Sequence, residues 1–212
     1  MVGLLRKEEI NLVLDVGANT GQFAAGLLAA GYKGRIVSFE PLSSAHAQLR
    51  ANAGQYPNWT VADRTALGEK SGSVEIHVSA FLPSSSILSM LPSHLEAAPG
   101  TDYVGTETVP VNRLDDLCAL SPTDRAFLKV DVQGYERQVF EGAPRVLANC
   151  RAVITEMSLV PLYEGQVLAR GLWDILESHG FEPWSLEPGF RDPATGRMLQ
   201  IDGTFVRSNF TR

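Results

Sequence analysis

The sequence predicts an α/β protein with a mostly parallel sheet of about seven strands and helices on both faces. Short apolar runs typical of buried strands alternate with segments whose apolar residues recur at helical spacing. In addition, 212 residues, of which 44% are hydrophobic, are enough to bury a core without disulfides or metals. We therefore expect residues 1–212 to form a single domain.

The first part of the chain carries three predicted strands and two predicted helices. Asn11–Gly17 is a nearly continuous apolar run, as expected for a strand covered on both faces. Gly21–Gly31 has apolar side chains at helical spacing and ends on a glycine. Arg35–Glu40 is predicted as the second strand, Pro41 opens the next helix, and Trp59–Leu67 is predicted as the third strand.

The middle of the chain departs from this alternation. Ser73–Ser79 alternates apolar and polar residues, which is typical of a half-buried antiparallel strand, and Thr108–Leu114 is its expected partner. Between them, Phe81–Thr106 is rich in proline, serine and glycine. Because a loop of this length in a compact domain is usually functional or mobile, we predict an inserted hairpin and lid loop over 73–114.

Regular alternation resumes in the last part of the chain. A strand, a helix, a second strand and a second helix are followed by two strands expected to form an antiparallel pair. In order, these elements are Ala126–Val132, Tyr135–Ala148, Ala152–Met157, Gln166–His179, Phe181–Leu186 and Gln200–Arg207.

Charge and composition exclude several classes of protein. With 18 Lys and Arg against 24 Asp and Glu, and no basic block, a nucleic-acid partner is not expected. No run of eighteen apolar residues predicts a transmembrane segment, and Met1–Ile10 lacks the apolar run of a signal peptide. Cys118 and Cys150 lack the spacing of a zinc or redox motif. We interpret them as reduced thiols and expect a cytoplasmic protein.

The first predicted strand runs into a turn that contains Gly17 and Gly21, with Asn19 between them. Glycines at such a turn let the backbone approach a ligand, and the start of the following helix offers free N–H groups to an anion. The spacing Gly-x-x-x-Gly departs from the Gly-x-Gly-x-x-Gly pattern of NAD-binding turns. An NAD-linked oxidoreductase is therefore the less favoured alternative.

Two acidic residues accompany this turn. Asp15, near the end of the first strand, is placed to meet a ligand ammonium directly or through water. Glu40 ends the second strand roughly twenty residues after the turn, where a carboxylate can accept hydrogen bonds from both ribose hydroxyls. This combination suits a nucleoside with a zwitterionic tail, such as S-adenosylmethionine. The alternative is a surface glutamate and a helix-capping network.

Five blocks of sequence occur in a fixed order and together resemble the FkbM family of S-adenosylmethionine-dependent methyltransferases. The resemblance extends from about Asn11 to the C-terminus. It implies a Rossmann-like class I methyltransferase fold and O-methylation of a hydroxyl on a small-molecule, sugar or glycolipid-type acceptor. The blocks are DVGANTGQF (Asp15–Phe23), VSFEP (Val37–Pro41), TALG (Thr65–Gly68), FLKVDVQGYE (Phe127–Glu136) and ITEMSLVPLYEGQ (Ile154–Gln166).

The resemblance also implies a cofactor-binding set. It places the methionine moiety against the glycine turn, the ribose on Glu40, and the adenine near Pro41 and the end of the third strand. Asp63 or Arg64 would meet the exocyclic amine or flank the ring, and Asp63 is chemically the better acceptor for an amine. The full set is Asp15, Gly17, Ala18, Asn19, Gly21, Phe23, Glu40, Pro41, Asp63, Arg64 and Ala66.

Candidate catalytic residues come from the later strands. Methyl transfer from a sulfonium to oxygen is an in-line displacement, in which the protein aligns the reactants and accepts a hydroxyl proton. Asp131 ends the fourth strand, where open parallel sheets place ligands, and is a candidate base with Glu156 as its neighbour. The pair could raise one pKa, bind a divalent cation such as Mg²⁺, or simply hydrogen-bond neighbouring turns. His94 in the lid is another candidate base, and Tyr163 could pack beside the acceptor.

Two further hypotheses stay open. A non-catalytic module could have kept the nucleoside pocket and lost transfer, although the presence of Glu40, Asp131 and Glu156 disfavours it. A nucleic-acid methyltransferase is disfavoured by the acidic charge and the absence of an Asn-Pro-Pro-type motif. Acceptor choice is expected to come from Phe81–Thr106, from the loops after the fourth and fifth strands, or from the second subunit of a homodimer.

Overall fold

Seven strands form the central sheet of the computed structural model, which describes residues 1–208. The last four residues of the predicted domain, 209–212, lie outside the described residues. The strands are β1 (Leu12–Val16), β2 (Arg35–Phe39), β3 (Trp59–Val61), β7 (Ala126–Val130), β8 (Cys150–Ser158), β9 (Phe181–Pro188) and β10 (Gln200–Arg207).

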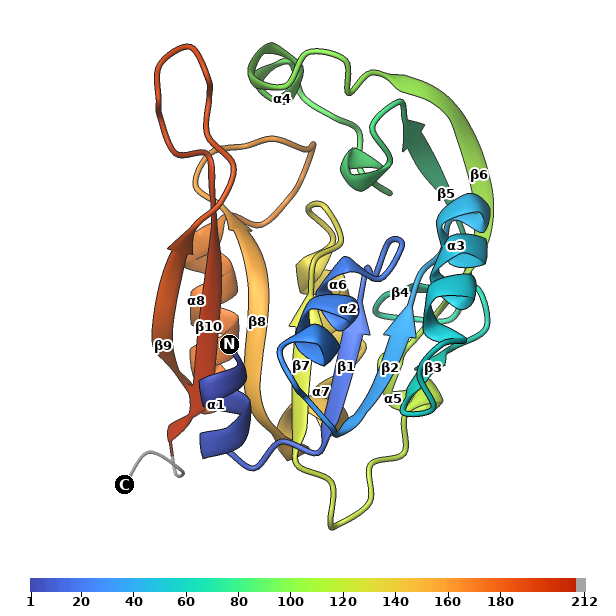
Figure 1. Cartoon of the computed structure of the whole chain (residues 1–212). Helices are drawn as coiled ribbons and strands as arrows, with labels where there is room; N and C mark the ends of the chain where they lie inside the picture. Colours follow the sequence, from blue (N-terminus) through green and yellow to red (C-terminus); the bar gives the residue numbers. More distant parts are fainter. Residues whose placement is uncertain (209–212) are drawn as a thin grey trace.

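The order of the strands across this sheet is β3-β2-β1-β7-β8-β10-β9 (Figure 1). Strand β10 is antiparallel to both of its neighbours, whereas the other neighbouring pairs are parallel. The predicted α/β fold with a mostly parallel sheet is therefore confirmed. The chain leaves β1 toward β2 and later returns to the other side of β1 as β7. Ligands of open α/β sheets bind at such a switch point, outside the carboxyl ends of the strands.

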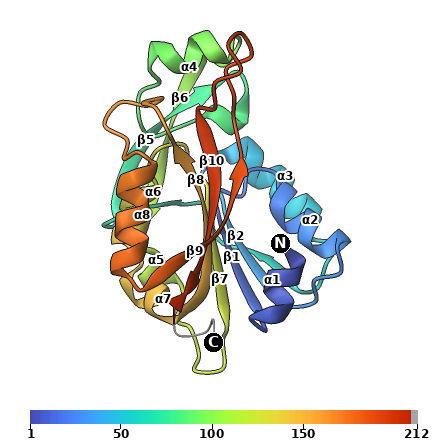
Figure 2. The same ribbon diagram turned by 90° about the vertical axis from the view of Figure 1, so that its left-hand side faces the viewer.

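Helices cover both faces of the sheet (Figure 2). Successive strand residues point to opposite faces, so Val13 of β1 packs on one side and Leu12 and Leu14 pack on the other. This burial on both faces explains why the run at β1 is continuously apolar. One face carries α1 (Val2–Lys7), α2 (Gln22–Ala29) and α3 (Ser43–Ala53), and the other carries α5 (Leu114–Leu117), α6 (Glu136–Glu141), α7 (Pro144–Asn149) and α8 (Ala169–Ser178).

A second, three-stranded sheet lies beside the first. Its strands are β4 (Ala66–Leu67), β5 (Gly72–Ser79) and β6 (Tyr103–Asn112), in the order β4-β6-β5. The pairing of β5 with β6 is antiparallel, so the predicted inserted hairpin is confirmed, although β6 begins earlier than the predicted Thr108.

The chain between β5 and β6, residues 80–102, is called the lid segment below. It contains the 3₁₀ turn η1 (Leu82–Ser84) and the helix α4 (Pro92–Ala97), and it lies over the carboxyl ends of the central strands (Figure 1). The backbones of His77 and Ser86 exchange two hydrogen bonds, and Leu91 N donates to the carbonyl of Leu162 at 2.9 Å. The lid segment therefore joins the second sheet to the loop that follows β8.

The predicted third strand, Trp59–Leu67, is wrong as a single element. The structure divides it into β3, in the central sheet, and β4, in the second sheet. The change of sheet follows from contacts with β6: Arg64 forms an ion pair with Glu107, and Thr65 Oγ1 donates to the carbonyl of Pro110 at 3.2 Å. These contacts draw the chain away from β2 after Val61.

The single helix predicted for Tyr135–Ala148 is also wrong, because the structure has two short helices, α6 and α7. Pro144 stands in the first turn of α7, where a missing N–H is tolerated but the preceding helix cannot continue through it. Gly142 lies between them, and a Cβ there would come within 2.0 Å of the carbonyl oxygen of Gly68. The break lets two backbone segments approach closely.

Two further sequence expectations concern the chain as a whole. Within residues 1–208, no helix combines the length and apolar character needed to cross a membrane. Cys118 and Cys150 are both free, which confirms that these thiols are unpaired.

Candidate functional site

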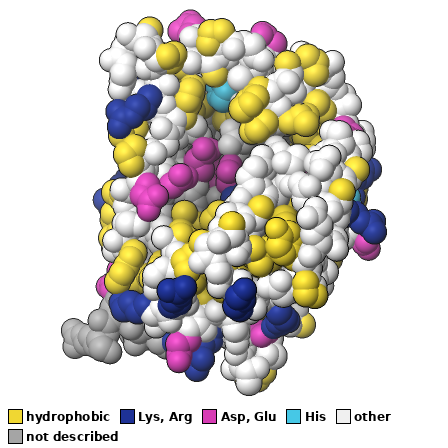
Figure 3. Space-filling view, viewed as in Figure 1, with side chains coloured by type: hydrophobic (Ala, Val, Ile, Leu, Met, Phe, Trp, Pro, Cys, Tyr) yellow, Lys and Arg dark blue, Asp and Glu magenta, His cyan; other side chains and the backbone are white. Residues whose placement is uncertain are grey.

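A cleft opens at the carboxyl ends of β1, β2, β7 and β8, beneath the lid segment (Figure 3). It consists of two cavities of about 230 and 280 Å³. The first cavity extends toward Glu40 and Leu42, and the second toward Phe23 and Asp202. The two share wall residues and so form one continuous cleft. The shared residues are Gly17, Asn19, Pro83, Asp131 and Glu156.

The glycine turn is pressed against the sheet. Gly17 and Gly21 adopt φ values of +72° and +95°, which side chains rarely tolerate. A Cβ on Gly17 would come within 1.8 Å of the carbonyl oxygen of Asp131, and one on Gly21 within 2.5 Å of the Trp59 ring. Both glycines are therefore required by packing, and the result is that the backbone of the turn lines the cleft next to β7.

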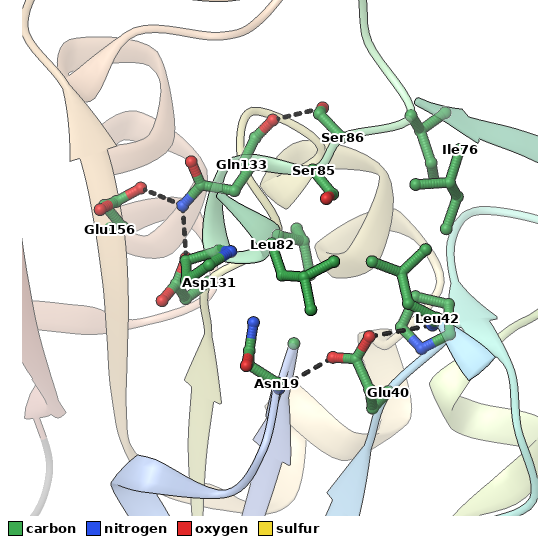
Figure 4. Close-up of a pocket in the computed structure, with 15 residues that line it drawn as sticks. Asn19, Glu40, Leu42, Ile76, Leu82, Ser85, Ser86, Asp131, Gln133 and Glu156 are labelled. Carbon is green, nitrogen blue, oxygen red and sulfur yellow. Dashed lines mark hydrogen bonds between the residues drawn. The ribbon is translucent and has the colours of Figure 1, made fainter. Parts of the chain in front are cut away.

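Glu40 is buried, with 5% of its surface exposed, at the end of β2. Its Oε2 accepts a hydrogen bond from Asn19 N at 2.8 Å, and its Oε1 accepts one from Leu42 N at 2.9 Å (Figure 4). Burial raises the pKa of Glu40 to about 7, against the lowering effect of these two bonds. Each carboxylate oxygen has a second lone pair, so Glu40 can fix the turn and still accept two hydrogen bonds from a ligand.

Asp15 lies below the cleft rather than in its wall. It is fully buried, accepts a hydrogen bond from Ser38 Oγ at 3.2 Å, and lines neither cavity. Its second partner is Lys129, whose Nζ is 3.3 Å from Asp15 Oδ1. The carboxylate of Asp15 is thus paired with Lys129 and does not face a ligand in the cleft.

Lys129 is a functional candidate that the sequence reasoning missed. Its ammonium donates to the carbonyls of Gly17 and Val16 at 2.7 and 3.2 Å, and lies 3.7 Å from Asp131 Oδ2. Burial lowers the pKa of Lys129, but the attraction of Asp15 and Asp131 outweighs it, so the pKa is raised and the side chain stays charged. A lysine inside an otherwise apolar strand, two residues before Asp131, was the available signal.

The structure brings Asp131 and Glu156 together through one amide. Gln133 Nε2 donates to Asp131 Oδ1 and to Glu156 Oε2, both at 2.9 Å (Figure 4). Gln200 Nε2 donates to the same Glu156 oxygen at 2.6 Å, and Tyr163 Oη donates to Gln133 Oε1 at 2.8 Å. Burial and the neighbouring carboxylates raise the pKa of Glu156 well above its ordinary value.

These contacts do not fit a divalent cation. Within residues 1–208 no three His, Cys, Asp or Glu side chains are grouped so as to hold a metal ion. The position between Asp131 and Glu156 is taken by the amide N–H group of Gln133, a donor that replaces a bridging cation. The two carboxylates therefore act as hydrogen-bond acceptors here, not as the predicted Mg²⁺ ligands.

His94 lies outside the cleft. It is buried in α4, where its ring packs 5.2 Å from that of Tyr163 and 5.7 Å from that of Phe190, and it lines neither cavity. Burial lowers the pKa of His94, which favours the neutral ring. Tyr163 is likewise fully buried, and its Oη donates to Gln133 Oε1 at 2.8 Å and lies 3.3 Å from the carbonyl oxygen of Ser84.

The remaining predicted cofactor contacts are divided. Ala18 and Phe23 line the second cavity and Pro41 lines the first. Ala66 of β4 lines neither, but it lines a smaller cavity of about 30 Å³ that shares Gly17, Pro41 and Val132 with the first. Asp63 is exposed and lines neither cavity.

The side chain of Arg64 is bonded to other residues of the protein. It donates to the carbonyl of Pro41 at 3.2 Å and forms an ion pair with Glu107 of β6.

Sequence reasoning missed the apolar wall of the first cavity, because its members come from separate elements. They are Leu42, Ile76, Leu82, Ile87 and Val132.

The strand order and the switch-point cleft define the class of the protein. Solved methyltransferases share this fold. The structure of methyltransferase FkbM from Methylobacillus flagellatus KT superposes with a TM-score of 0.59 at 17% identity, covering 92% of this chain and 44% of that one. Magnesium protoporphyrin IX methyltransferase from Synechocystis PCC 6803, solved with bound S-adenosylmethionine, gives a TM-score of 0.52 at 14% identity, covering 98% and 76%.

The particular family follows from the sequence model of the Methyltransferase FkbM domain, which matches residues 15–183. The chain belongs to the FkbM family and is an S-adenosylmethionine-dependent methyltransferase of the Rossmann-like class I fold. Family membership confirms the resemblance and argues against an NAD-linked oxidoreductase.

Two curated relatives are methyltransferases. The chain is 30% identical over 185 residues to 2-O-methyltransferase NoeI of Sinorhizobium fredii, covering 84% of this chain and 75% of that protein. It is 29% identical over 154 residues to hexuronic acid methyltransferase AglP of Haloferax volcanii, covering 71% of this chain and 57% of that protein.

Proposed function

We propose that the protein transfers a methyl group from S-adenosylmethionine to a hydroxyl of a sugar or sugar-containing acceptor. The observation that carries the proposal is the cleft itself, in which Glu40 and Asp131 face each other across the glycine turn (Figure 4). A relative named as a 2-O-methyltransferase and another named for a hexuronic acid support an oxygen of a sugar as the target.

The residues present fit the cofactor. Glu40 keeps one lone pair on each oxygen for the two ribose hydroxyls, and Leu42, Ile76 and Val132 offer apolar surface to the adenine. The turn at Asn19 would hold the methionine moiety. When bound, S-adenosylmethionine supplies an electrophilic methyl group on a cationic sulfonium.

The chain's own residues then have three tasks in the cleft. Asp131, which lines both cavities, accepts the proton of the attacking hydroxyl through the oxygens that face the cleft. Gln133 holds Asp131 in place by its amide hydrogen bond. The lid segment covers the site, since Ser86 Oγ donates to the carbonyl of Gln133 at 2.7 Å, and it limits access of water.

Ligand binding and methyl incorporation together test this function. S-adenosylhomocysteine at about 100 times its Kd should add about 2.7 kcal/mol to the stability of the protein, whereas NAD should add nothing. Labelled methyl groups should pass from S-adenosylmethionine to hydroxylated glycosides. Stabilisation by NAD but not by S-adenosylhomocysteine would contradict the proposal, and so would methyl transfer only to nitrogen or sulfur nucleophiles.

Cellular location, domain number, oligomeric state and further partners stay predictions. The free thiols of Cys118 and Cys150 support a cytoplasmic location, where glutathione keeps cysteines reduced. A single domain, a homodimer and the absence of a nucleic-acid partner also stay predictions. Size-exclusion chromatography with light scattering would test the homodimer directly.

A further inference from the structure

Four carboxylates lie at one level on four neighbouring strands. Asp202 of β10 is directly opposite Glu156 of β8 on one side and Glu187 of β9 on the other. Asp131 follows β7 directly and lies level with Glu156, because β7 and β8 pair in register up to the preceding residue. Opposed residues of neighbouring strands project from the same face of a sheet. Asp131, Glu156, Asp202 and Glu187 therefore form a row, called the acidic row below.

The acidic row runs along the second cavity. Asp131, Glu156 and Asp202 all line that cavity, and acidic side chains gather across the hollow beneath the lid segment in Figure 3. Both hydrogen bonds to Glu156 reach Oε2, and no residue within 1–208 donates to its Oε1. An acceptor atom thus remains for a ligand in the cavity.

No free positive charge balances the row. Of the described residues that line the two cavities, Lys129 is the one cation. Its ammonium already contacts Asp15, Asp131 and two backbone carbonyls. A ligand carboxylate or phosphate in the second cavity would therefore meet the carboxylate of Asp202 without a cation of its own.

Within the acidic row, Asp202 lies two strands beyond Asp131. Strands β7 and β10 are separated by β8, and neighbouring strands lie about 4.8 Å apart, so Asp202 is about 10 Å from the level of Asp131 in the sheet. The charge of Asp131 can serve the sulfonium, but that of Asp202 must act on something else in the cavity. The acceptor is the remaining reactant.

The rest of the second cavity suits a sugar ring. Phe23 presents an aromatic ring that is stacked on Phe127, and Gln22 supplies a polar side chain to the same cavity. An ionised carboxylate accepts hydrogen bonds but cannot donate them, so Asp202 selects ligands that present O–H or N–H groups. An aromatic wall with a few acceptors is typical of pockets for small polar ligands.

Resting on the O-methyltransferase function above, we propose that the second cavity is the acceptor site and that it takes a non-anionic polyhydroxylated sugar, with an amino substituent preferred over a carboxylate. Glu156 and Asp202 receive the hydroxyl or ammonium donors of this sugar, while Asp131 faces the hydroxyl to be methylated. The acceptor of this chain thereby differs in charge from the hexuronic acid named for its relative from Haloferax volcanii.

A matched set of three ligands tests the charge preference without turnover. Methyl glucoside, methyl 6-amino-6-deoxyglucoside and methyl glucuronide share one ring and differ only at C6. Titrated by ligand-observed NMR into the protein saturated with S-adenosylhomocysteine, the amine should bind best and the glucuronide at least about tenfold more weakly, because like charges brought together in a binding site are costly. Binding of the glucuronide as tightly as the glucoside, or no binding by any of the three, would overturn the proposal.

Charge-removing variants show whether the acidic row is responsible. Asp202→Asn should reduce the ratio of amine to glucuronide affinity by at least about threefold, since one repelling charge is lost. Asp174→Asn on the outer surface of α8 is the control and should leave the ratio unchanged. An unchanged ratio in Asp202→Asn would place the selection elsewhere and overturn the role of the row.

Failure of this inference can be distinguished from failure of the proposed function. Methyl incorporation into glucuronides in preference to the neutral and amino sugars would uphold O-methylation and overturn the acceptor class. A charge preference in binding, without methyl transfer to any hydroxyl, would uphold the acceptor class and overturn O-methylation.

Discussion

The two sides of the cleft hold their carboxylates in different ways. On the β2 side, Glu40 receives hydrogen bonds from the backbone N–H groups of Asn19 and Leu42. On the β7–β8 side, Asp131 and Glu156 share the side-chain amide of Gln133. Under the proposed function, backbone donors fix the carboxylate that meets the cofactor, which is the constant part of the reaction. The side-chain donors Gln133 and Gln200 can then change with the acceptor without disturbing the cofactor.

Lys129 lies where the two sides of the cleft meet, and its substitution should have the largest effect, a loss of folding stability. Lys129→Met leaves Asp15 buried without a cation, and loss of one partner of a buried ion pair costs about 3 kcal/mol or more. Denaturant unfolding should show this loss of free energy. The double variant Asp15→Asn with Lys129→Met should recover part of it. A stability of Lys129→Met equal to that of the unmodified protein would contradict the structural role of the pair.

The buried carboxylates predict that the ligand-free protein loses stability as the pH rises. The pKa values of Glu40 and Glu136 are raised by burial to about 7. Between pH 4.5 and 7 the folded protein therefore binds more protons than the unfolded chain, and stability falls with pH across this window. Glu40 alone accounts for up to about 3 kcal/mol.

This pH dependence is measured by thermal unfolding at a series of pH values. Glu40→Gln should flatten the dependence, because the amide does not titrate. Glu164→Gln, a change on the exposed surface of the loop after β8, serves as control and should leave it as it was. A slope in Glu40→Gln identical to that of the unmodified protein would show that Glu40 is ionised throughout.

On the acceptor side, Asp131→Asn should reduce methyl transfer by at least about 100-fold, the usual contribution of a general base. Single-turnover transfer from S-adenosylmethionine measures the loss. The exposed change Asp174→Asn controls for nonspecific effects. Full activity of Asp131→Asn would remove Asp131 from the reaction.

Gln133→Met should give the smallest effect, a loss of about tenfold in kcat with little change in cofactor affinity. The substitution removes the donor that holds Asp131 and Glu156 together, and it leaves Tyr163 Oη without the amide oxygen. Gln48→Met on the exposed face of α3 is the matched control. A weaker cofactor affinity with unchanged kcat would assign Gln133 to the other side of the cleft.

The contrast between the β2 side and the β7–β8 side of the cleft also explains what could be predicted from the sequence. The strands, the glycine turn and Glu40 are local features, since each is decided by a few neighbouring residues and a known spacing. The burial of β1 and β7 on both faces followed from the same periodicity, because their apolar runs are continuous. The order of the strands across the sheet was not among the predictions. The division of Trp59–Leu67 between two sheets could not be predicted, since it depends on Glu107 and Pro110, more than forty residues away.

The acceptor side escaped prediction for a physical reason. Asp202 and Gln200 reach Glu156 only because β10 inserts between β8 and β9 in a particular register. The burial of His94 behind Tyr163 likewise depends on how the lid segment packs, which no local pattern in residues 80–102 specifies. Such contacts lie between segments distant in sequence.

Calorimetric titration of S-adenosylhomocysteine into the Glu40→Gln and Asp131→Asn variants tests the division of the cleft most directly. The Kd should rise by at least about tenfold in Glu40→Gln, which loses the charged acceptor for the ribose, and should stay within about threefold in Asp131→Asn. Equal affinities in the unmodified protein and Glu40→Gln, or a loss confined to Asp131→Asn, would contradict the assignment of the cofactor to the β2 side.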